Sequence, residues 1–239
     1  MHDTWQSWGA SLIGPAHARS GIQNQDSWIA RKYIWGNVVV VADGLGSKPH
    51  SGVGSKAVCM AVVEASKIYR NNSQEKPNDL LRLVHSIWRI NISPFSVSDC
   101  ATTCLFALQI NELIILGRLG DGMICVIGNE DKNNRTLSDN KHSSFSNYTD
   151  SLRQNFDDNQ WEIVTLNAEQ CNAILLCTDG ISDDLLPEKK QDFCKSFITE
   201  FSRQPTKKRN KSIKKMLNNW PVPHHSDDKT IACLMRVTE

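Results

Sequence analysis

Acidic residues stand at the ends of three apolar, strand-like stretches of this chain. Asp43 follows VVVVA, Asp179 follows AILLCT, and the pair Asp227-Asp228 precedes KTIACLMRV. A carboxylate at a strand end lies where a sheet meets solvent, and several converging carboxylates form the hard oxygen site that suits Mg²⁺ or Mn²⁺. The pattern therefore predicts metal-assisted hydrolysis and favours a phosphate ester as the substrate.

Each of these dipeptides also has a plainer interpretation. Asp-Gly is a common turn, so Asp43-Gly44 or Asp179-Gly180 alone is equally compatible with a turn. Two such dipeptides after buried strands, together with an acidic pair before a third, favour a metal site. Gly44 would also let a backbone carbonyl approach a cation closely. For Asp121, between Gly120 and Gly122, the residues alone favour a hairpin turn.

Motifs for other nucleophiles are absent from the sequence. There is no GxSxG elbow, no CxxxxxR loop and no GxxxxGK[ST] phosphate loop. The fragment GVGSKA matches a loose dinucleotide pattern but does not follow a strand directly. Water activated by a metal is therefore the natural nucleophile.

The elements that must position the acidic residues follow from the apolar periodicity. Helical spacing predicts helices over 55–69 and 78–90, and a helical region over 188–219 with a break near Pro205. Strands are predicted over 8–18, 27–33, 37–42, 104–110, 113–119, 123–127, 161–166, 173–177 and 230–237. The short connections after 110 and 119 indicate antiparallel neighbours, hence an α+β fold. Residues 129–160 are polar and suggest a loop or insertion.

Composition narrows the class of protein. The chain has 239 residues and a formal net charge of +1, which suits one domain over 1–239 and indicates no general affinity for nucleic acid or membrane. No apolar run is long enough to span a bilayer, and the N-terminus lacks signal-peptide features. Eight cysteines, mostly within apolar runs, indicate buried free thiols and a cytoplasmic protein. Basic clusters at 207–209 and 214–215 are best interpreted as a solvated helix face.

Six motifs, in order, resemble the metal-dependent Ser/Thr protein phosphatases of the PP2C (PPM) type. They are NQD (Asn24, Gln25, Asp26), ADGLGS (Asp43, Gly44), ATTC (Ala101 to Cys104), GDG (Asp121), TDGISDDL (Asp179) and SDDKT (Asp227, Asp228). The resemblance covers most of the chain. It is closest to a compact bacterial branch that carries HxRxGxxxQD (His17, Arg19, Gly21, Gln25, Asp26) and FxNxTxxL (Phe145, Asn147, Thr149, Leu152).

The resemblance implies an α+β, four-layer αββα sandwich of two antiparallel β-sheets flanked by helices. It also implies two Mn²⁺ or Mg²⁺ ions bridged by Asp43, with the Gly44 carbonyl as a ligand of one. Asp179 and Asp227 would complete the carboxylate set of the other ion, and Asp121 would join Asp179 around a third, weaker ion. The implied reaction is in-line attack of metal-activated water on phosphoserine or phosphothreonine.

The sequence departs from the family pattern at three places. Gln25 replaces the usual Glu, so Asp26 would carry the metal shell there. Arg19 stands where a phosphate-binding Arg is expected, but two residues further from Gln25 than usual. Leu45 occupies the position of a general-acid His, which leaves leaving-group protonation to water or to His17 or His50.

These residues predict a cytoplasmic phosphatase whose partner is a phosphoprotein, such as the product of a Ser/Thr kinase pathway. Asp43, Asp179 and Arg19 are its predicted catalytic residues. Two alternatives remain open at this point: a pseudophosphatase that binds a phosphoprotein without turnover, which Gln25 suggests, and a small-molecule phosphomonoesterase. His224-His225, beside Asp227, could supply a metal ligand or proton donor, although a surface loop is the simpler interpretation.

Overall fold

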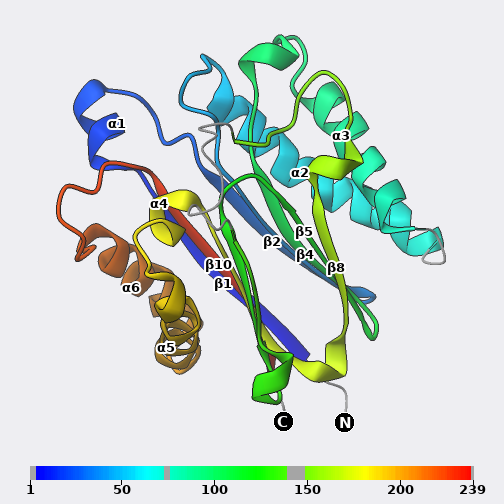
Figure 1. Ribbon diagram of the computed structural model, residues 1–239, viewed down its shortest axis with the longest axis vertical. Helices are drawn as coiled ribbons and strands as arrows, with labels where there is room; N and C mark the ends of the chain where they lie inside the picture. The colour runs from blue at the N-terminus through cyan, green and yellow to red at the C-terminus, as the bar shows by residue number, and fades with distance from the viewer. Residues whose placement is uncertain (1–3, 73–75, 139–148, 238–239) are drawn as a thin grey trace.

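The computed structural model describes residues 4–72, 76–138 and 149–237 (Figure 1). Its strands are β1 (Thr4–Leu12), β2 (Ser27–Tyr33), β3 (Gly36–Ala42), β4 (Cys104–Ile110), β5 (Leu113–Leu119), β6 (Met123–Gly128), β7 (Arg135–Leu137), β8 (Glu162–Asn167), β9 (Cys171–Cys177) and β10 (Lys229–Val237). Its α-helices are α1 (Pro15–Ser20), α2 (Ser51–Tyr69), α3 (Pro77–Asn91), α4 (Asp179–Ser182), α5 (Lys190–Ser202) and α6 (Thr206–Asn218).

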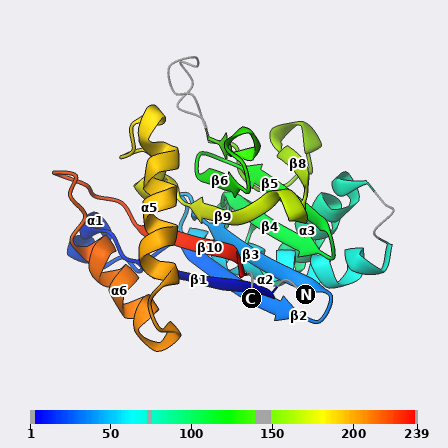
Figure 2. The ribbon, with the colours of Figure 1, turned by 90° about the horizontal axis from the view of Figure 1, so that it is seen from below.

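The described strands form two five-stranded sheets, and every pairing in them is antiparallel. One sheet has the order β1-β10-β9-β6-β7 and the other the order β2-β3-β4-β5-β8. The sheets lie face to face, with α2 and α3 outside one and α5 and α6 outside the other (Figures 1 and 2). The predicted α+β sandwich of four layers is therefore confirmed.

Side-chain alternation along β3 explains how a continuous apolar run fits this architecture. Val38 and Val40 belong to the cluster beneath α2 and α3, whereas Val39 and Val41 belong to the cluster between the sheets. A strand buried on both faces needs apolar residues at every position, not at every second one. A third cluster, with Cys233 of β10 and Phe201 of α5 among its members, fills the remaining interlayer space.

The strand register brings the acidic residues to one end of the sandwich. Ser27 pairs with Ala42, and Cys104 pairs with Leu119, so Asp26, Asp43 and Asp121 lie at the same end of their sheet. In the other sheet Cys177 pairs with both Met123 and Ile231. Asp121, Asp179 and Asp227 therefore lie at the matching end, and the two groups meet where the sheets face each other.

Two sequence-based predictions were wrong in detail. The first strand ends at Leu12, and residues of the predicted strand 8–18 instead form α1, because Pro15 supplies a preset helical φ at the first turn. Gly120–Gly122 is not a hairpin turn: β5 pairs with β4 and β8, while β6 pairs with β7 and β9 of the other sheet. The chain crosses between sheets there, and Gly120 has a φ of 102° that only glycine adopts readily.

The remaining predicted elements agree within a few residues with the structure. The region 188–219 forms α5 and α6 on either side of Pro205, and the polar region 129–160 contains the short β7. All eight cysteines are buried and free. Within the described ranges, no helix combines the length and apolarity required to cross a bilayer.

Candidate functional site

Asp43 directly follows β3, and two threonines before β4 hold its main chain. The Asp43 N–H donates to Thr103 Oγ1 at 2.9 Å, and the Thr103 N–H donates to the Asp43 carbonyl at 2.8 Å. The Thr102 hydroxyl donates to that same carbonyl at 2.7 Å. At Gly44 an added Cβ would lie 2.6 Å from the backbone of Ser51, so no larger residue fits. The position of the Asp43 carboxylate is thus fixed by its backbone.

Asp26 joins the two sheets. Its side chain is 5% exposed, and Thr178 at the end of β9 donates its hydroxyl to Asp26 Oδ2 at 2.8 Å. The Asp26 N–H donates to Asn24 Oδ1 at 2.9 Å, which makes a local turn before β2. Asp26 therefore lies within the carboxylate group, as predicted, although Thr178 was not identified from the sequence.

Asp121 and Asp179 lie on either side of the crossing between sheets. Thr149 donates its hydroxyl to Asp121 Oδ2 at 2.9 Å, and Ser182 donates to the Asp121 carbonyl at 3.4 Å. The Gly180 N–H donates to Asp179 Oδ1 at 2.8 Å at the start of α4. An added Cβ at Gly180 would overlap the carbonyl of Asp228, so this Asp-Gly pair is required by packing.

The neighbouring acids before β10 have opposite roles. Asp228 is 1% exposed, and its carboxylate accepts from the Gly14 N–H at 2.6 Å and from the Gln25 N–H at 2.7 Å. His17 Nδ1 lies 3.0 Å from the same carboxylate. Asp227 is exposed, and its Oδ1 accepts only the Asp228 N–H, at 2.8 Å, within the described residues. Asp228 thus holds together the segments that carry Gly14, His17 and Gln25. Asp227 retains oxygen lone pairs that a cation could use.

The carboxyl groups raise one another's pKa. Burial, followed by the charges of Asp26 and Asp179, raises the pKa of Asp43 well above its ordinary value. Burial, followed by the charges of Asp121 and Asp227, raises the pKa of Asp179 to about 8. Burial also raises the pKa of Asp26 to about 6. Although the residue Asp227 is exposed as a whole, partial desolvation of its carboxyl group raises its pKa as well. These residues, with Asp121, form what we call the carboxylate cluster.

The donor set fits a divalent cation. Gln25 Oε1 is buried without a hydrogen-bond partner among the described residues, and the main chain of Gln25 accepts the Gly44 N–H, next to Asp43, at 3.2 Å. The carboxylate cluster itself offers only oxygen atoms. Oxygen donors with excess negative charge are the preferred environment of Mg²⁺ and Mn²⁺, and a cation would relieve the mutual repulsion. Among the described residues, no three His, Cys, Asp or Glu side chains already stand at metal-binding spacing. A cation would therefore have to draw these carboxylates together.

Several residues singled out in the sequence lie apart from this cluster. Arg19 is exposed on α1, and the structure gives it no contact with the acids. His17 faces Asp228, and His50 packs against Phe95 with ring centroids 4.3 Å apart. His225 faces Lys229, 3.1 Å from its Nζ. Of the segment FxNxTxxL, Phe145 and Asn147 lie outside the described residues.

Sequence reasoning missed the hydroxyl groups that support the acids. Thr102 and Thr103 hold Asp43, and Thr178 holds Asp26. The available signal was position, because Thr178 immediately precedes Asp179 and the two other threonines immediately precede β4. Lys229, which lies 3.3 Å from the carbonyl of Asp227, is a buried cation beside the cluster that was also not identified.

Comparisons with known proteins agree with this geometry. The family model described as Protein phosphatase 2C matches residues 13–218. The catalytic domain of the serine threonine protein phosphatase PstP, solved with 2 manganese ions, has a TM-score of 0.64 at 16% identity, over 99% of this chain and 100% of that one. Serine/threonine phosphatase Stp1 from Staphylococcus aureus has a TM-score of 0.63 at 13% identity, over 100% and 96%.

The photosystem II phosphatase PBCP also has this fold, with a TM-score of 0.63 at 14% identity over 98% of this chain and 99% of that one. Comparison of the sequence with curated proteins gave no match.

Proposed function

The chain belongs to the protein phosphatase 2C family, and from this premise we propose which of its residues carry out metal-dependent hydrolysis of phosphoproteins. The activity is that of a Ser/Thr protein phosphatase, a hydrolase that requires divalent metal ions. The observation that carries the assignment is the meeting of acids from both sheets at one end of the sandwich, where burial and then the charges of the neighbouring acids raise the pKa of Asp43. No observation in the structure favours a pseudophosphatase or a small-molecule phosphomonoesterase.

We assign the metal ligands as Asp26, Asp43, the Gly44 carbonyl, Asp121, Asp179 and Asp227. Asp43 occupies the central position because its charge is coupled to those of Asp26, Asp179 and Asp227. The choice of Asp227 over Asp228 is supported by the three donors that already occupy Asp228. Two ions, with a third and weaker one near Asp121, match this donor set, and both Mn²⁺ and Mg²⁺ suit it.

The assigned ligands would hold Mn²⁺ or Mg²⁺, which would supply an activated water and would neutralise charge on the phosphoryl oxygens. The protein positions these ions through rigid strand ends, since Asp43 is held by Thr102 and Thr103. With Leu45 where a general-acid His would stand and His17 engaged by Asp228, we assign protonation of the leaving group to water. Arg19 remains a predicted phosphate ligand, which would have to reach the phosphate from the exposed surface of α1.

We further propose that residues 1–239 form one phosphatase domain acting on a phosphoprotein made by a Ser/Thr kinase. A cytoplasmic location is supported by eight buried thiols with no disulfide, which suit a reducing compartment. No feature argues for a nucleic acid or a membrane as a partner.

The test is hydrolysis of p-nitrophenyl phosphate and of a phosphothreonine peptide with Mn²⁺, with Mg²⁺ and with EDTA. Asp43→Asn is compared with Asp192→Asn, which makes the same chemical change on the exposed side of α5. We expect metal-dependent activity in the wild type and Asp192→Asn, and its loss in Asp43→Asn. A folded wild type inactive with every metal would contradict the assignment.

A further inference from the structure

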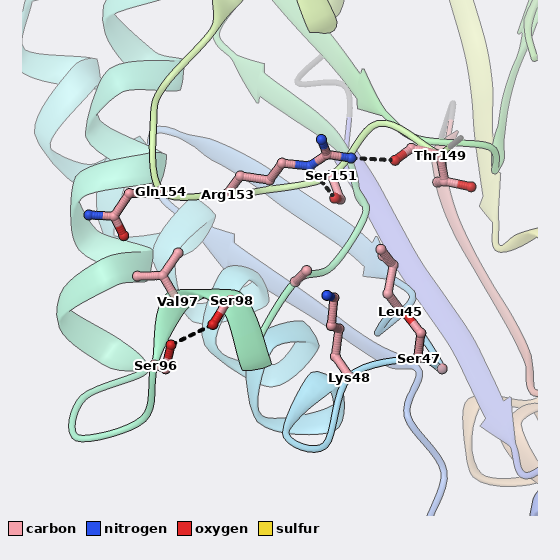
Figure 3. A pocket seen from close by; sticks show the side chains of 12 residues that line it. Leu45, Ser47, Lys48, Ser96, Val97, Ser98, Thr149, Ser151, Arg153 and Gln154 are labelled. Carbon is pink, nitrogen blue, oxygen red and sulfur yellow. Dashed lines mark hydrogen bonds between the residues drawn. The ribbon is translucent and has the colours of Figure 1, made fainter. Parts of the chain in front are cut away.

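A cavity of about 830 Å³ is lined by residues that adjoin or contact the acids, and Figure 3 shows the side chains that line it. Three of its lining segments connect directly to the acids. Leu45 and Gly46 follow Asp43-Gly44, and Ala101 precedes Thr102, which holds the Asp43 carbonyl. Thr149 lines the cavity and also donates to Asp121. A molecule bound at the acids would therefore extend into this cavity.

The described lining is cationic and rich in hydroxyl groups. Lys48 and Arg153 are its charged residues, and no Asp or Glu is among the described residues that line it. The hydroxyl-bearing members are Ser47, Ser96, Ser98, Thr149 and Ser151. Two acids are neighbours in sequence of lining residues, Asp99 beside Ser98 and Asp150 between Thr149 and Ser151, and neither of them lines the cavity. Asp99 accepts from Ser98 at 3.4 Å. This combination of donors and positive charge suits an anionic group.

The two cations are held differently. Arg153 is fixed, since its Nε donates to Ser151 Oγ at 3.2 Å and its Nη2 donates to the Thr149 carbonyl at 3.1 Å. Lys48 rises from the loop after Asp43 toward the segment that carries Ser151 (Figure 3). Within the described residues its side chain has no hydrogen bond or ion pair, although it is only partly exposed. Lys48 is thus a cation available to a ligand.

We propose that this cavity, built around Lys48 and Arg153, binds a second acidic or phosphorylated side chain of the substrate, beside the phosphoresidue at the carboxylate cluster. This proposal rests on the proposed function, and it specifies the substrate class as phosphoproteins with a second anionic side chain close to the phosphorylated residue. The volume exceeds what a single phosphate needs and suits a side chain with its flanking backbone. Because the lining begins at Leu45, two positions after Asp43, and includes Thr149, which contacts Asp121, we expect the second anion within about three positions of the phosphorylated residue, a span of about 10 Å in an extended peptide.

The test uses phosphothreonine peptides in which one Glu is moved through the flanking positions, each paired with the Gln peptide of the same sequence. The readout is the ratio of kcat/KM for the Glu peptide to that for its Gln partner. We expect the wild type to prefer Glu by about fivefold at one or two positions, as suits a partly exposed charged contact. High salt should reduce this ratio through screening.

Lys48→Met and Lys48→Glu test the residue, and Lys211→Glu, on the exposed face of α6, is the matched control. Lys48→Met should bring the ratio to within about twofold of unity, and Lys48→Glu should reverse the preference, while Lys211→Glu keeps the wild-type ratio. Because each ratio compares two substrates of one preparation, partial unfolding cancels. Substituting Arg153 is less informative because it also supports the Thr149 segment.

The outcomes separate the two proposals. A wild type that hydrolyses neither p-nitrophenyl phosphate nor any peptide would contradict the proposed function itself. A wild type that hydrolyses p-nitrophenyl phosphate but shows no preference for Glu at any position would overturn only the anionic subsite. A Glu preference that survives in Lys48→Glu would overturn it as well.

Discussion

Two acidic regions lie side by side at one end of this sandwich, and their carboxylates have opposite surroundings. Asp228 is surrounded by donors: the N–H groups of Gly14 and Gln25, and His17. In the carboxylate cluster, Asp43 and Asp179 face other acids, and burial together with those charges raises their pKa values. A carboxylate with hydrogen-bond donors on all sides stabilises the fold, whereas a group of mutually repelling carboxylates with Lys229 beside it favours the binding of a further cation.

Substitution of Asp43 should have the largest effect on activity. We expect Asp43→Asn to lower kcat/KM by about a thousandfold or more, because it removes the ligand coupled to three other acids. The metal-free protein should be no less stable, since one repelling charge is gone. Steady-state kinetics with Mn²⁺, beside thermal melts, measure both effects. A large loss of metal-free stability would mean that Asp43 is structural.

Asp227 and Asp228 provide the sharpest pair of matched variants. Asp227→Asn should lower activity by about a hundredfold while leaving the free energy of unfolding nearly unchanged. Asp228→Asn should instead cost about 2 kcal/mol of stability, because it weakens charge-assisted bonds to two backbone N–H groups. Denaturant unfolding and kinetics on both variants check this. If both variants lost activity alone, or both lost stability alone, Asp227 and Asp228 would not have the separate roles assigned to them.

The pH dependence of the metal-free protein follows from the raised pKa values. Folded Asp26 and Asp179 have pKa values of about 6 and about 8, against 3.8 for an ordinary Asp. Between these values the folded protein holds protons that the unfolded chain has released, so this stability is present at low pH and is lost as pH rises through 6 and 8. We expect the Tm without metal to fall by about 8–16 °C from pH 5.5 to pH 8.5.

Added Mn²⁺ should raise the Tm more at pH 8.5 than at pH 5.5, because the ligands are then ionised. In Asp43→Asn the fall without metal should be smaller. A metal-free Tm that rises over the same pH range would contradict the electrostatic account of the cluster.

The smallest expected effect concerns Gln25. Its buried Oε1 has no hydrogen-bond partner among the described residues, so we expect the negative charge introduced by Gln25→Glu to attract a cation. We expect Mn²⁺ affinity to rise about threefold to tenfold, with stability of the metal-free protein slightly lower. Gln25→Met, which removes the oxygen, is the matched control and should weaken binding. Equal affinities in all three proteins would show that this side chain does not face the metal.

Local patterns in the sequence were sufficient to predict that Asp43 and Asp179 lie at strand ends. Each follows an apolar run, and the length and residue spacing of that run predict a strand. Asp121 was different, because Gly120–Gly122 has the local chemistry of a hairpin turn, and only pairing across the whole sheet reveals a crossing to the other layer. The choice between Asp227 and Asp228 likewise depends on contacts with distant segments, since Gly14, His17 and Gln25 all engage the carboxylate of Asp228.

Other contacts between residues far apart in the chain could not be predicted from the sequence. Lys48 and Arg153 meet at one cavity because the loop after β3 and the segment before β8 lie at the same end of the sandwich. Neither belongs to a motif. Thr178 and Asp26 are likewise joined only by the facing of two sheets.

The most direct measurement is calorimetric titration of Mn²⁺ into the metal-free protein at pH 7 in two buffers of different ionisation enthalpy. The raised pKa of Asp179, about 8, means that binding must displace protons. We predict submillimolar binding with net proton release in the wild type and in Asp192→Asn, and loss of both in Asp43→Asn. Absence of Mn²⁺ binding in the folded wild type, or equal binding in Asp43→Asn, would contradict a metal centre built on the carboxylate cluster.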